Sequence, residues 1–223
     1  MKNQDYKNSA LDALKGSWPE SIVTAIVYFA IAAVCTAPSA LQGNGSDLLW
    51  VSPVLFVAAS GSTILLSLLF LSPLQVGYYN TFKRLHREGD TGLVGNLFSQ
   101  GFGNWGHIVP GQLLMGIFIF LWSLLLIVPG IIKAYSYAMT PYILVDRPEL
   151  SVRDAIRLSG RMMSGRKLDL FCLHLSFIGW MLLCILTLGI GILFLSPYMM
   201  TAQAAFYQDV RSDYEMKTAE AGL

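Results

Sequence analysis

The sequence contains few charged residues. Asp, Glu, Lys and Arg make up 13% of the 223 residues, whereas 54% are hydrophobic, and a soluble surface needs roughly 25% charged residues. The formal net charge of +1 provides no global basic field, so the composition excludes a disordered chain and predicts no nucleic-acid partner. The shortage of charge therefore indicates an all-α integral membrane protein.

Cysteine and catalytic motifs are also scarce. Cys35, Cys172 and Cys184 do not form a disulfide or metal pattern, and we interpret them as small buried apolar residues. The sequence has no His-Glu-x-x-His, Gly-x-Ser-x-Gly, P-loop or Cys-x-x-Cys motif. His174 has no second ligand at metal-binding spacing, which favours a buried, hydrogen-bonded imidazole. We therefore expect no enzymatic activity, no metal and no cofactor.

The charges that are present separate long uncharged runs. The last run, residues 170–208, would be about 60 Å long as one helix, twice the hydrocarbon thickness of a bilayer. Gly189 and Gly191 favour a tight turn with left-handed backbone in its middle, and Pro129-Gly130 marks a similar turn earlier. Residues 37–52 form a looser, Pro-, Ser-, Gly- and Asn-rich loop.

These breaks predict six transmembrane helices arranged as three helical hairpins. A four-span alternative merges each short hairpin into one helix, but those helices would be too long for a bilayer. The six predicted spans are residues 19–36, 53–74, 107–128, 131–145, 170–188 and 192–208.

The basic residues give an independent prediction of topology. If the amino terminus is cytoplasmic, every Lys and Arg except Lys133 falls in a cytoplasmic segment, as the positive-inside rule requires. Both termini are then cytoplasmic, in a multi-pass protein of the bacterial cytoplasmic membrane. The first twenty residues are polar, so we expect the first span to act as an uncleaved anchor. The four cytoplasmic segments are residues 1–18, 75–106, 146–169 and 209–223.

An internal repeat organises the single domain. A short amphipathic segment ending in glycine precedes each hairpin, and we expect a helix lying in the membrane interface there. The repetition suggests a pseudo-threefold arrangement. The amphipathic segments are residues 10–18, 97–105 and 155–167, the repeats are approximately 9–84, 94–147 and 151–211, and 212–223 is a short polar tail.

The second helix of each hairpin mixes Tyr with other polar residues after a proline. Such residues are costly against lipid, so we expect these three helices to form the inner ring of the bundle. Lys133 is either an intramembrane binding residue or a side chain that snorkels from the outer end of its span. The candidate polar core or path consists of Gln75, Tyr78, Lys133, Tyr135, Thr140, Gln203 and Tyr207.

The segment from Leu150 to Lys167 carries a basic stripe. Ser151 and Asp154 have capping-box spacing, and arginines recur every four residues after them. Such a helix could bind anionic lipid or an acidic partner, at about 1 kcal/mol per basic residue, or simply fix topology. The candidate lipid contacts are Arg153, Arg157, Arg161, Arg166 and Lys167.

Several motifs resemble those of one family. Residues 164–167, 175–180, 186–191 and 196–198 (Ser-Gly-Arg-Lys, Leu-Ser-Phe-Ile-Gly-Trp, Leu-Thr-Leu-Gly-Ile-Gly and Ser-Pro-Tyr) resemble the bacterial integral membrane proteins grouped as domain of unknown function 975. The motifs at residues 14–18 and 101–105 also fit. The resemblance implies a bacterial cytoplasmic membrane location and no established activity. The sequence is more loosely similar to the membrane domain found beside some glycerophosphodiester phosphodiesterases, which implies a lipid-related context. The catalytic domain of those enzymes is not part of this sequence.

Two functions remain in view. The first is a non-enzymatic scaffold or envelope-associated module that acts through membrane lipids, including anionic phospholipid, or a membrane-protein partner. The second is a small permease or transporter subunit whose polar second helices line a substrate path. Convergence of the polar candidates on one continuous cavity would favour the second function.

Overall fold

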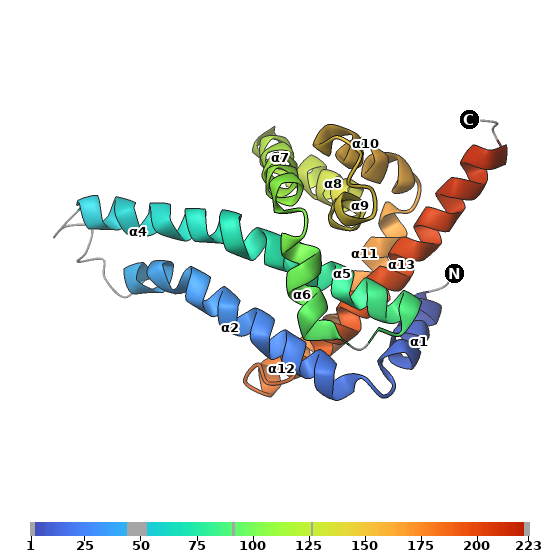
Figure 1. Ribbon diagram of the computed structural model, residues 1–223, viewed down its shortest axis with the longest axis horizontal. Coiled ribbons are helices and arrows are strands. Elements are labelled where there is room, and N and C mark those ends of the chain that lie inside the picture. The colour runs from blue at the N-terminus through green and yellow to red at the C-terminus, as the bar shows by residue number, and fades with distance from the viewer. Residues whose placement is uncertain (1–2, 44–52, 91, 126, 221–223) are drawn as a thin grey trace.

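The chain is all-helical over the residues that the computed structural model describes, which are 3–43, 53–90, 92–125 and 127–220. Helices α2 and α4 extend side by side to one end of the molecule, and both termini lie at the opposite end (Figure 1). The helices are α1 (Asn3–Leu14), α2 (Trp18–Gly43), α4 (Pro53–Leu66), the π-helical η1 (Ser67–Leu71), α5 (Ser72–Glu88), α6 (Leu93–Phe102), α7 (Trp105–Leu125), α8 (Ile127–Tyr137), α9 (Thr140–Asp146), α10 (Val152–Met162), α11 (Lys167–Leu175), α12 (Ile178–Leu186) and α13 (Ile192–Glu220).

The first helix pair is longer than the sequence suggested. Helix α2 continues to Gly43, so the prediction of a loop from residue 37 is wrong over residues 37–43, and 44–52 lie outside the described residues. Helices α4, η1 and α5 follow one another without a break. The π-helical turn disturbs the regular hydrogen bonding, and Trp105 Nε1 donates to the carbonyl oxygen of Leu69 inside it at 2.9 Å.

Helix α6 packs backbone to backbone against α5. A Cβ atom added at Gly77 would lie 2.0 Å from the carbonyl oxygen of Leu97, and one added at Gly101 would lie 2.5 Å from that of Pro73. Only glycine fits at these two positions because any side chain would collide with the neighbouring main chain. The pair of glycines thus holds α6 against the polar second helix of the first pair.

The later helices depart from the predicted spans at their breaks. The prediction of a turn at Pro129-Gly130 is wrong, because both residues lie inside α8. The predicted span 131–145 divides into α8 and α9, and 170–188 divides into α11 and α12 near Ser176. The turn before α13 has left-handed backbone at Leu188 and Gly189, as predicted for Gly189, but not at Gly191. Gly191 is instead needed for space, since its added Cβ would lie 2.9 Å from Cys184 Sγ.

Three short helices overlap the amphipathic segments of the predicted repeat, while the repeat of three hairpins stays a prediction. They are α1, α6 and α10, and α1 and α10 are followed by left-handed glycines, Gly16 and Gly165. Gly103 after α6 keeps right-handed backbone. Each short helix buries one face in the protein: Tyr6, Ala10 and Leu14 do so on α1. Their location in a membrane interface stays a prediction, as does the threefold arrangement.

Four helices are long and apolar enough to cross a membrane among the described residues: Trp18–Ala37, Ser60–Glu88, Trp105–Leu124 and Lys167–Leu186. The structure thus supports a membrane protein without confirming six spans. The predicted spans 131–145 and 192–208 are missing from this set. The first is broken between α8 and α9, and the second carries the polar residues that were expected to face inward.

The second helices of the pairs carry much of the buried surface. Helices α5, α9 and α13 contain runs of buried residues, whereas α7 and α12 expose large apolar side chains such as Phe120 and Leu186. Such exposed apolar surface suits a lipid environment. Cys35 and Cys184 are buried as predicted, but the prediction is wrong for Cys172, which is exposed on α11.

Candidate functional site

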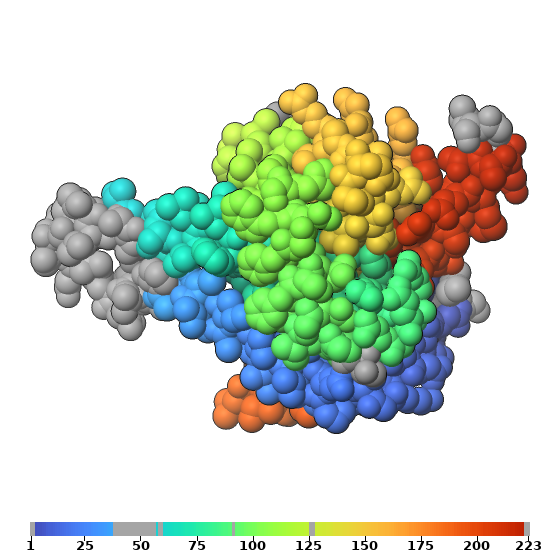
Figure 2. Space-filling model, in the orientation of Figure 1, coloured from blue at the N-terminus to red at the C-terminus, as the bar shows by residue number. Residues whose placement is uncertain are grey.

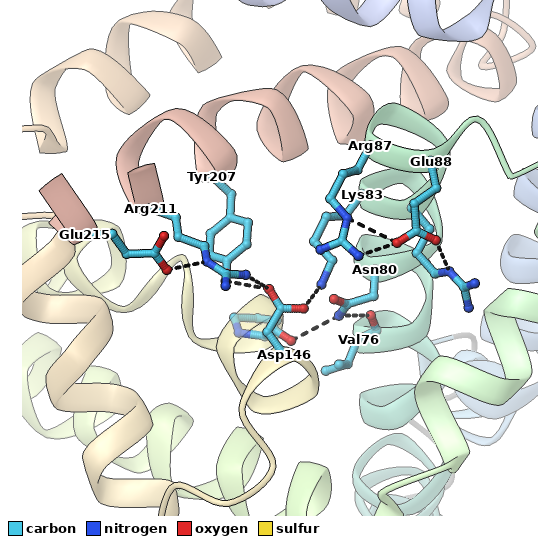
Figure 3. Close-up of polar contacts among 11 residues, drawn as sticks. Val76, Asn80, Lys83, Arg87, Glu88, Asp146, Tyr207, Arg211 and Glu215 are labelled. Atoms are coloured by element: carbon cyan, nitrogen blue, oxygen red, sulfur yellow. Dashed lines mark hydrogen bonds and ion pairs between the residues drawn. The ribbon is translucent and has the colours of Figure 1, made fainter. Parts of the chain in front are cut away.

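A charge-balanced cluster joins α5, α9 and α13. Asp146, at the last turn of α9, lies between Lys83 and Arg211 and forms an ion pair with each (Figure 3). Tyr207 donates to the same carboxylate at 2.8 Å, and Arg211 also pairs with Glu215 at 2.9 Å. We call these five residues the Asp146 cluster. Because Lys83 is only 5% exposed, the cluster supplies the counter-charge that a buried ammonium requires.

A second cluster of ion pairs surrounds Arg166. Its guanidinium pairs with Asp169 at 2.8 Å, Asp209 at 2.6 Å and Asp213 at 2.9 Å, and Tyr6 donates to Asp209. Burial alone would raise the pKa of Asp209. The hydrogen bonds from Tyr6 and Arg166 outweigh it, so the pKa of this carboxyl lies below its usual value. The cluster ties α1 and the start of α11 to α13.

A basic pocket of about 570 Å³ lies between α7, α8, α10 and the start of α11. The yellow-to-orange part of the chain that contains α10 forms the upper edge of the molecule in Figure 2, with side chains projecting outward. None of the described residues that line the pocket is Asp or Glu. Its cationic lining residues are Lys133, Arg153, Arg157, Arg161 and Lys167.

The basic pocket gathers most of the unpaired cations of the described chain. The structure describes fourteen Lys and Arg side chains, since fifteen are in the sequence and Lys2 lies outside the described residues. Ion pairs engage nine of these fourteen. The five without an ion pair among the described residues are Lys7, Lys133, Arg153, Arg161 and Lys167, and four of them line the pocket. Arg157, the remaining cation, has only a 3.5 Å contact with Asp154.

Helix α10 presents this stripe because its other face is buried. Ser151 caps the helix, and its Oγ accepts from the backbone N–H of Asp154 at 3.2 Å, as the spacing predicted. Ile156 and Ser159 are buried, and Ser159 donates to the carbonyl oxygen of Ser136 in α8 at 2.8 Å. Anchored in this way, α10 leaves its arginines exposed on the other side.

Lys133 lies with the arginine stripe instead of apart from it. Its ammonium is 4.7 Å from the ring centroid of Trp122 and 5.9 Å from that of Tyr137. Cation–π contacts of this kind attract the ammonium without neutralising its charge. Conversely, Arg166, which the sequence grouped with the stripe, belongs to the second cluster of ion pairs.

A separate polar cavity of about 370 Å³ lies between α5, α7, α8, α11 and α13. Tyr135 and His174 approach one another there, at 3.4 Å between the phenol oxygen and Nδ1. Gln112 Oε1 is buried and has no hydrogen-bond partner among the described residues. Three of the predicted polar-path residues line this cavity: Gln75, Tyr135 and Gln203.

The other predicted path residues lie elsewhere. Tyr78 stacks on Tyr28 with ring centroids 4.5 Å apart and shares a 2.7 Å hydrogen bond with Ser196. Thr140 is fully buried in α9, and Tyr207 belongs to the Asp146 cluster. The structure therefore brings three of the seven candidates to one cavity and distributes the rest.

Sequence reasoning missed the Asp146 cluster. Lys83 was counted only as one of the basic residues that indicate topology. The partners of Asp146 are separated from it by 63 and 65 residues, so no local spacing reveals the pairing.

Comparison with known proteins finds one family model that matches part of the chain. No curated protein and no solved structure matches the chain. The motifs at residues 14–18 and 101–105 lie outside the region of the family match, which contains α8 to α12, the arginine stripe and most of α13. The match confirms the resemblance seen in the motifs: residues 124–214 correspond to the family described as "Protein of unknown function (DUF975)".

Proposed function

We propose that this protein is a non-enzymatic module of the bacterial cytoplasmic membrane, a scaffold or envelope-associated protein, that binds anionic phospholipid headgroups in its basic pocket. The observation that carries the proposal is the concentration of unpaired cations. Four of the five described cations without an ion pair line one pocket, together with Arg157. Basic residues near an anionic membrane surface each contribute about 1 kcal/mol.

The four candidate spans and the exposed apolar surfaces of α7 and α12 support a membrane location for this pocket. Phe118 and Ile156 line it beside the cations, so apolar and basic groups meet at one opening. A phospholipid presents the same combination of an anionic headgroup and an apolar tail. The cations of the pocket therefore suit the headgroup of a phospholipid, and its apolar residues suit the acyl chain.

Lipid retention tests the proposal directly. We expect the purified protein to retain phosphatidylglycerol from nanodiscs that also contain phosphatidylcholine, as measured by native mass spectrometry. The triple variant Arg153→Gln, Arg157→Gln, Arg161→Gln should lose that enrichment, because it removes three pocket cations. Lys15→Gln is a matched control, since Lys15 is exposed and lies outside the pocket. Equal retention by both variants would contradict the proposal.

We further propose that both termini are cytoplasmic in a multi-pass arrangement. The four segments expected inside the cell contact one another: Tyr6 meets Arg166 and Asp209, and Lys83 meets Asp146. Segments that pair in this way share one side of the membrane. Reporter fusions at the carboxyl terminus test this, and a fusion active only outside the cytoplasm would contradict it.

The polar cavity favours a second candidate function, a small permease or transporter subunit. Gln112, with its unpartnered oxygen, and Gln203 both line it. Cysteine scanning at these two positions, in a Cys172→Ala background, tests the idea with a membrane-impermeant thiol reagent. Modification at both positions would support a water-accessible path, and protection at both would contradict it.

A further inference from the structure

The basic pocket contains more positive charge than one lipid phosphodiester can neutralise. We propose that it selects a phosphate ligand with at least two negative charges, such as a phosphomonoester, a diphosphate or two linked phosphodiesters, in preference to a single phosphodiester. This inference rests on the proposed function and specifies the ligand class of the same site.

The charge count is the first argument. Five cations line the pocket, and the only carboxylate that pairs with any of them, Asp154, reaches Arg157 alone, at 3.5 Å. A bound phosphodiester would supply one negative charge and leave at least three unpaired positive charges around it. A ligand with two or more charges removes more of this like-charge repulsion.

The origin of the cations is the second argument. The arginines come from α10, whereas Lys133 comes from α8 and Lys167 from the first residue of α11. Donors therefore approach the pocket from three helices. Arginine presents its donors as a planar fork that binds phosphate oxygens in pairs, and lysine adds a compact charge. Such a set can surround several phosphate oxygens at once.

The state of Lys133 is the third argument. Its ammonium lies over the rings of Trp122 and Tyr137, two aromatic side chains that hold it in place but leave it charged. Everywhere else in the described chain except at Lys7, cations outside the pocket are paired with carboxylates. The pocket thus holds most of the described cations that pair with no carboxylate.

Competition between lipids tests the charge requirement. The protein is placed in phosphatidylcholine nanodiscs with either phosphatidylglycerol, which has one phosphodiester, or cardiolipin, which has two, at equal total lipid charge. Retained lipid is counted by native mass spectrometry. A parallel arm measures the binding of inorganic pyrophosphate and orthophosphate to the protein in neutral detergent, which separates a lipid headgroup from a free phosphate.

We expect cardiolipin to be retained preferentially. Lys133→Gln and Arg161→Gln should each weaken its binding about fivefold, with Lys217→Gln as a control because Lys217 pairs with Asp213 away from the pocket. Arg161 is exposed, so its variant should fold even if Lys133→Gln does not.

The other outcomes are equally informative. If cardiolipin and phosphatidylglycerol were retained equally per phosphate charge, the requirement for two charges would be overturned. The proposal that the pocket binds anionic lipid would still stand. Loss of all anionic-lipid retention, with no pyrophosphate binding, would overturn both proposals. Binding of pyrophosphate without enrichment of cardiolipin over phosphatidylcholine would support the charge requirement and contradict the lipid headgroup.

Discussion

The Asp146 cluster and the basic pocket are built from the same residue types in opposite ways. In the Asp146 cluster, Lys83 and Arg211 share one carboxylate, and Glu215 adds another (Figure 3). In the basic pocket, five cations meet no carboxylate in the described lining. Both regions belong to segments that the sequence assigned to one side of the membrane, apart from Lys133 and Tyr207, which fall in predicted spans.

Burial explains the difference between these two regions. Lys83 is 5% exposed, and a charge so deeply buried must be paired because its desolvation is costly. Arg157 is 71% exposed, so water solvates it, and it needs no counter-charge beyond its 3.5 Å contact with the exposed Asp154. Paired charges therefore hold the helices of this protein in place, while unpaired charges remain free to attract a ligand.

The largest expected effect follows from removing the shared carboxylate. Asp146→Ala leaves Lys83 buried without a counter-charge, and breaking such a pair costs about 3–5 kcal/mol of unfolding free energy. Chemical denaturation in neutral detergent, followed by circular dichroism, measures the loss. Glu215→Gln is the matched control, because Glu215 is half exposed and exposed pairs contribute at most about 1 kcal/mol. Equal effects of the two variants would show that Asp146 has no special role.

Replacing the whole buried pair should have a smaller effect than breaking it. In the double variant Lys83→Met, Asp146→Leu no charge remains uncompensated at the pair, so most of the loss in Asp146→Ala should be recovered. The same denaturation measurement applies. A double variant as unstable as Asp146→Ala would show that Tyr207 and Arg211, which also contact Asp146, depend on its carboxylate.

Acid should weaken the second cluster in a defined pH range. The pKa of Asp209 is lowered in the folded protein, so its contribution to stability is present above the unfolded pKa of about 3.9 and is lost as pH falls through the lower folded value. Tyr6→Phe removes one hydrogen bond that lowers this pKa. The variant should lose stability at neutral pH and show a shallower decline in acid, measured by thermal unfolding at several pH values. An unchanged slope would contradict the role of Tyr6.

The sequence predicted features that depend on neighbours along the chain. Ser151 caps α10, and Gly189 adopts the left-handed turn. Each follows from spacings of a few residues, where helical periodicity and backbone sterics are decisive. The short helices α1, α6 and α10 were predicted for the same reason.

Features that depend on distant contacts were not predicted. The grouping of Lys133 with the arginines of α10 was not predicted, because nothing in its local sequence shows that α10 packs beside α8. Residues 192–208 of helix α13 were predicted as a span. Several polar residues of this helix are buried inside the protein, and they also lower its mean hydropathy, so it is not among the helices apolar enough to cross a membrane. Hydropathy measures composition, whereas burial against other helices is set by the fold.

The smallest expected effect is that of Arg161→Gln on the free energy of unfolding. Its sign should be opposite to that of removing a cation from the Asp146 cluster. Arg157 and Arg161 are four residues apart on α10, and like charges at that spacing repel by about 0.2–0.5 kcal/mol. The variant should therefore be slightly more stable than the wild type in neutral detergent, whereas loss of a cation from the Asp146 cluster destabilises. Once cardiolipin is added the order should reverse, because the wild type gains more ligand-linked stability. Thermal unfolding with and without the lipid measures both states, and a variant less stable in neutral detergent would show that Arg161 contributes to the fold.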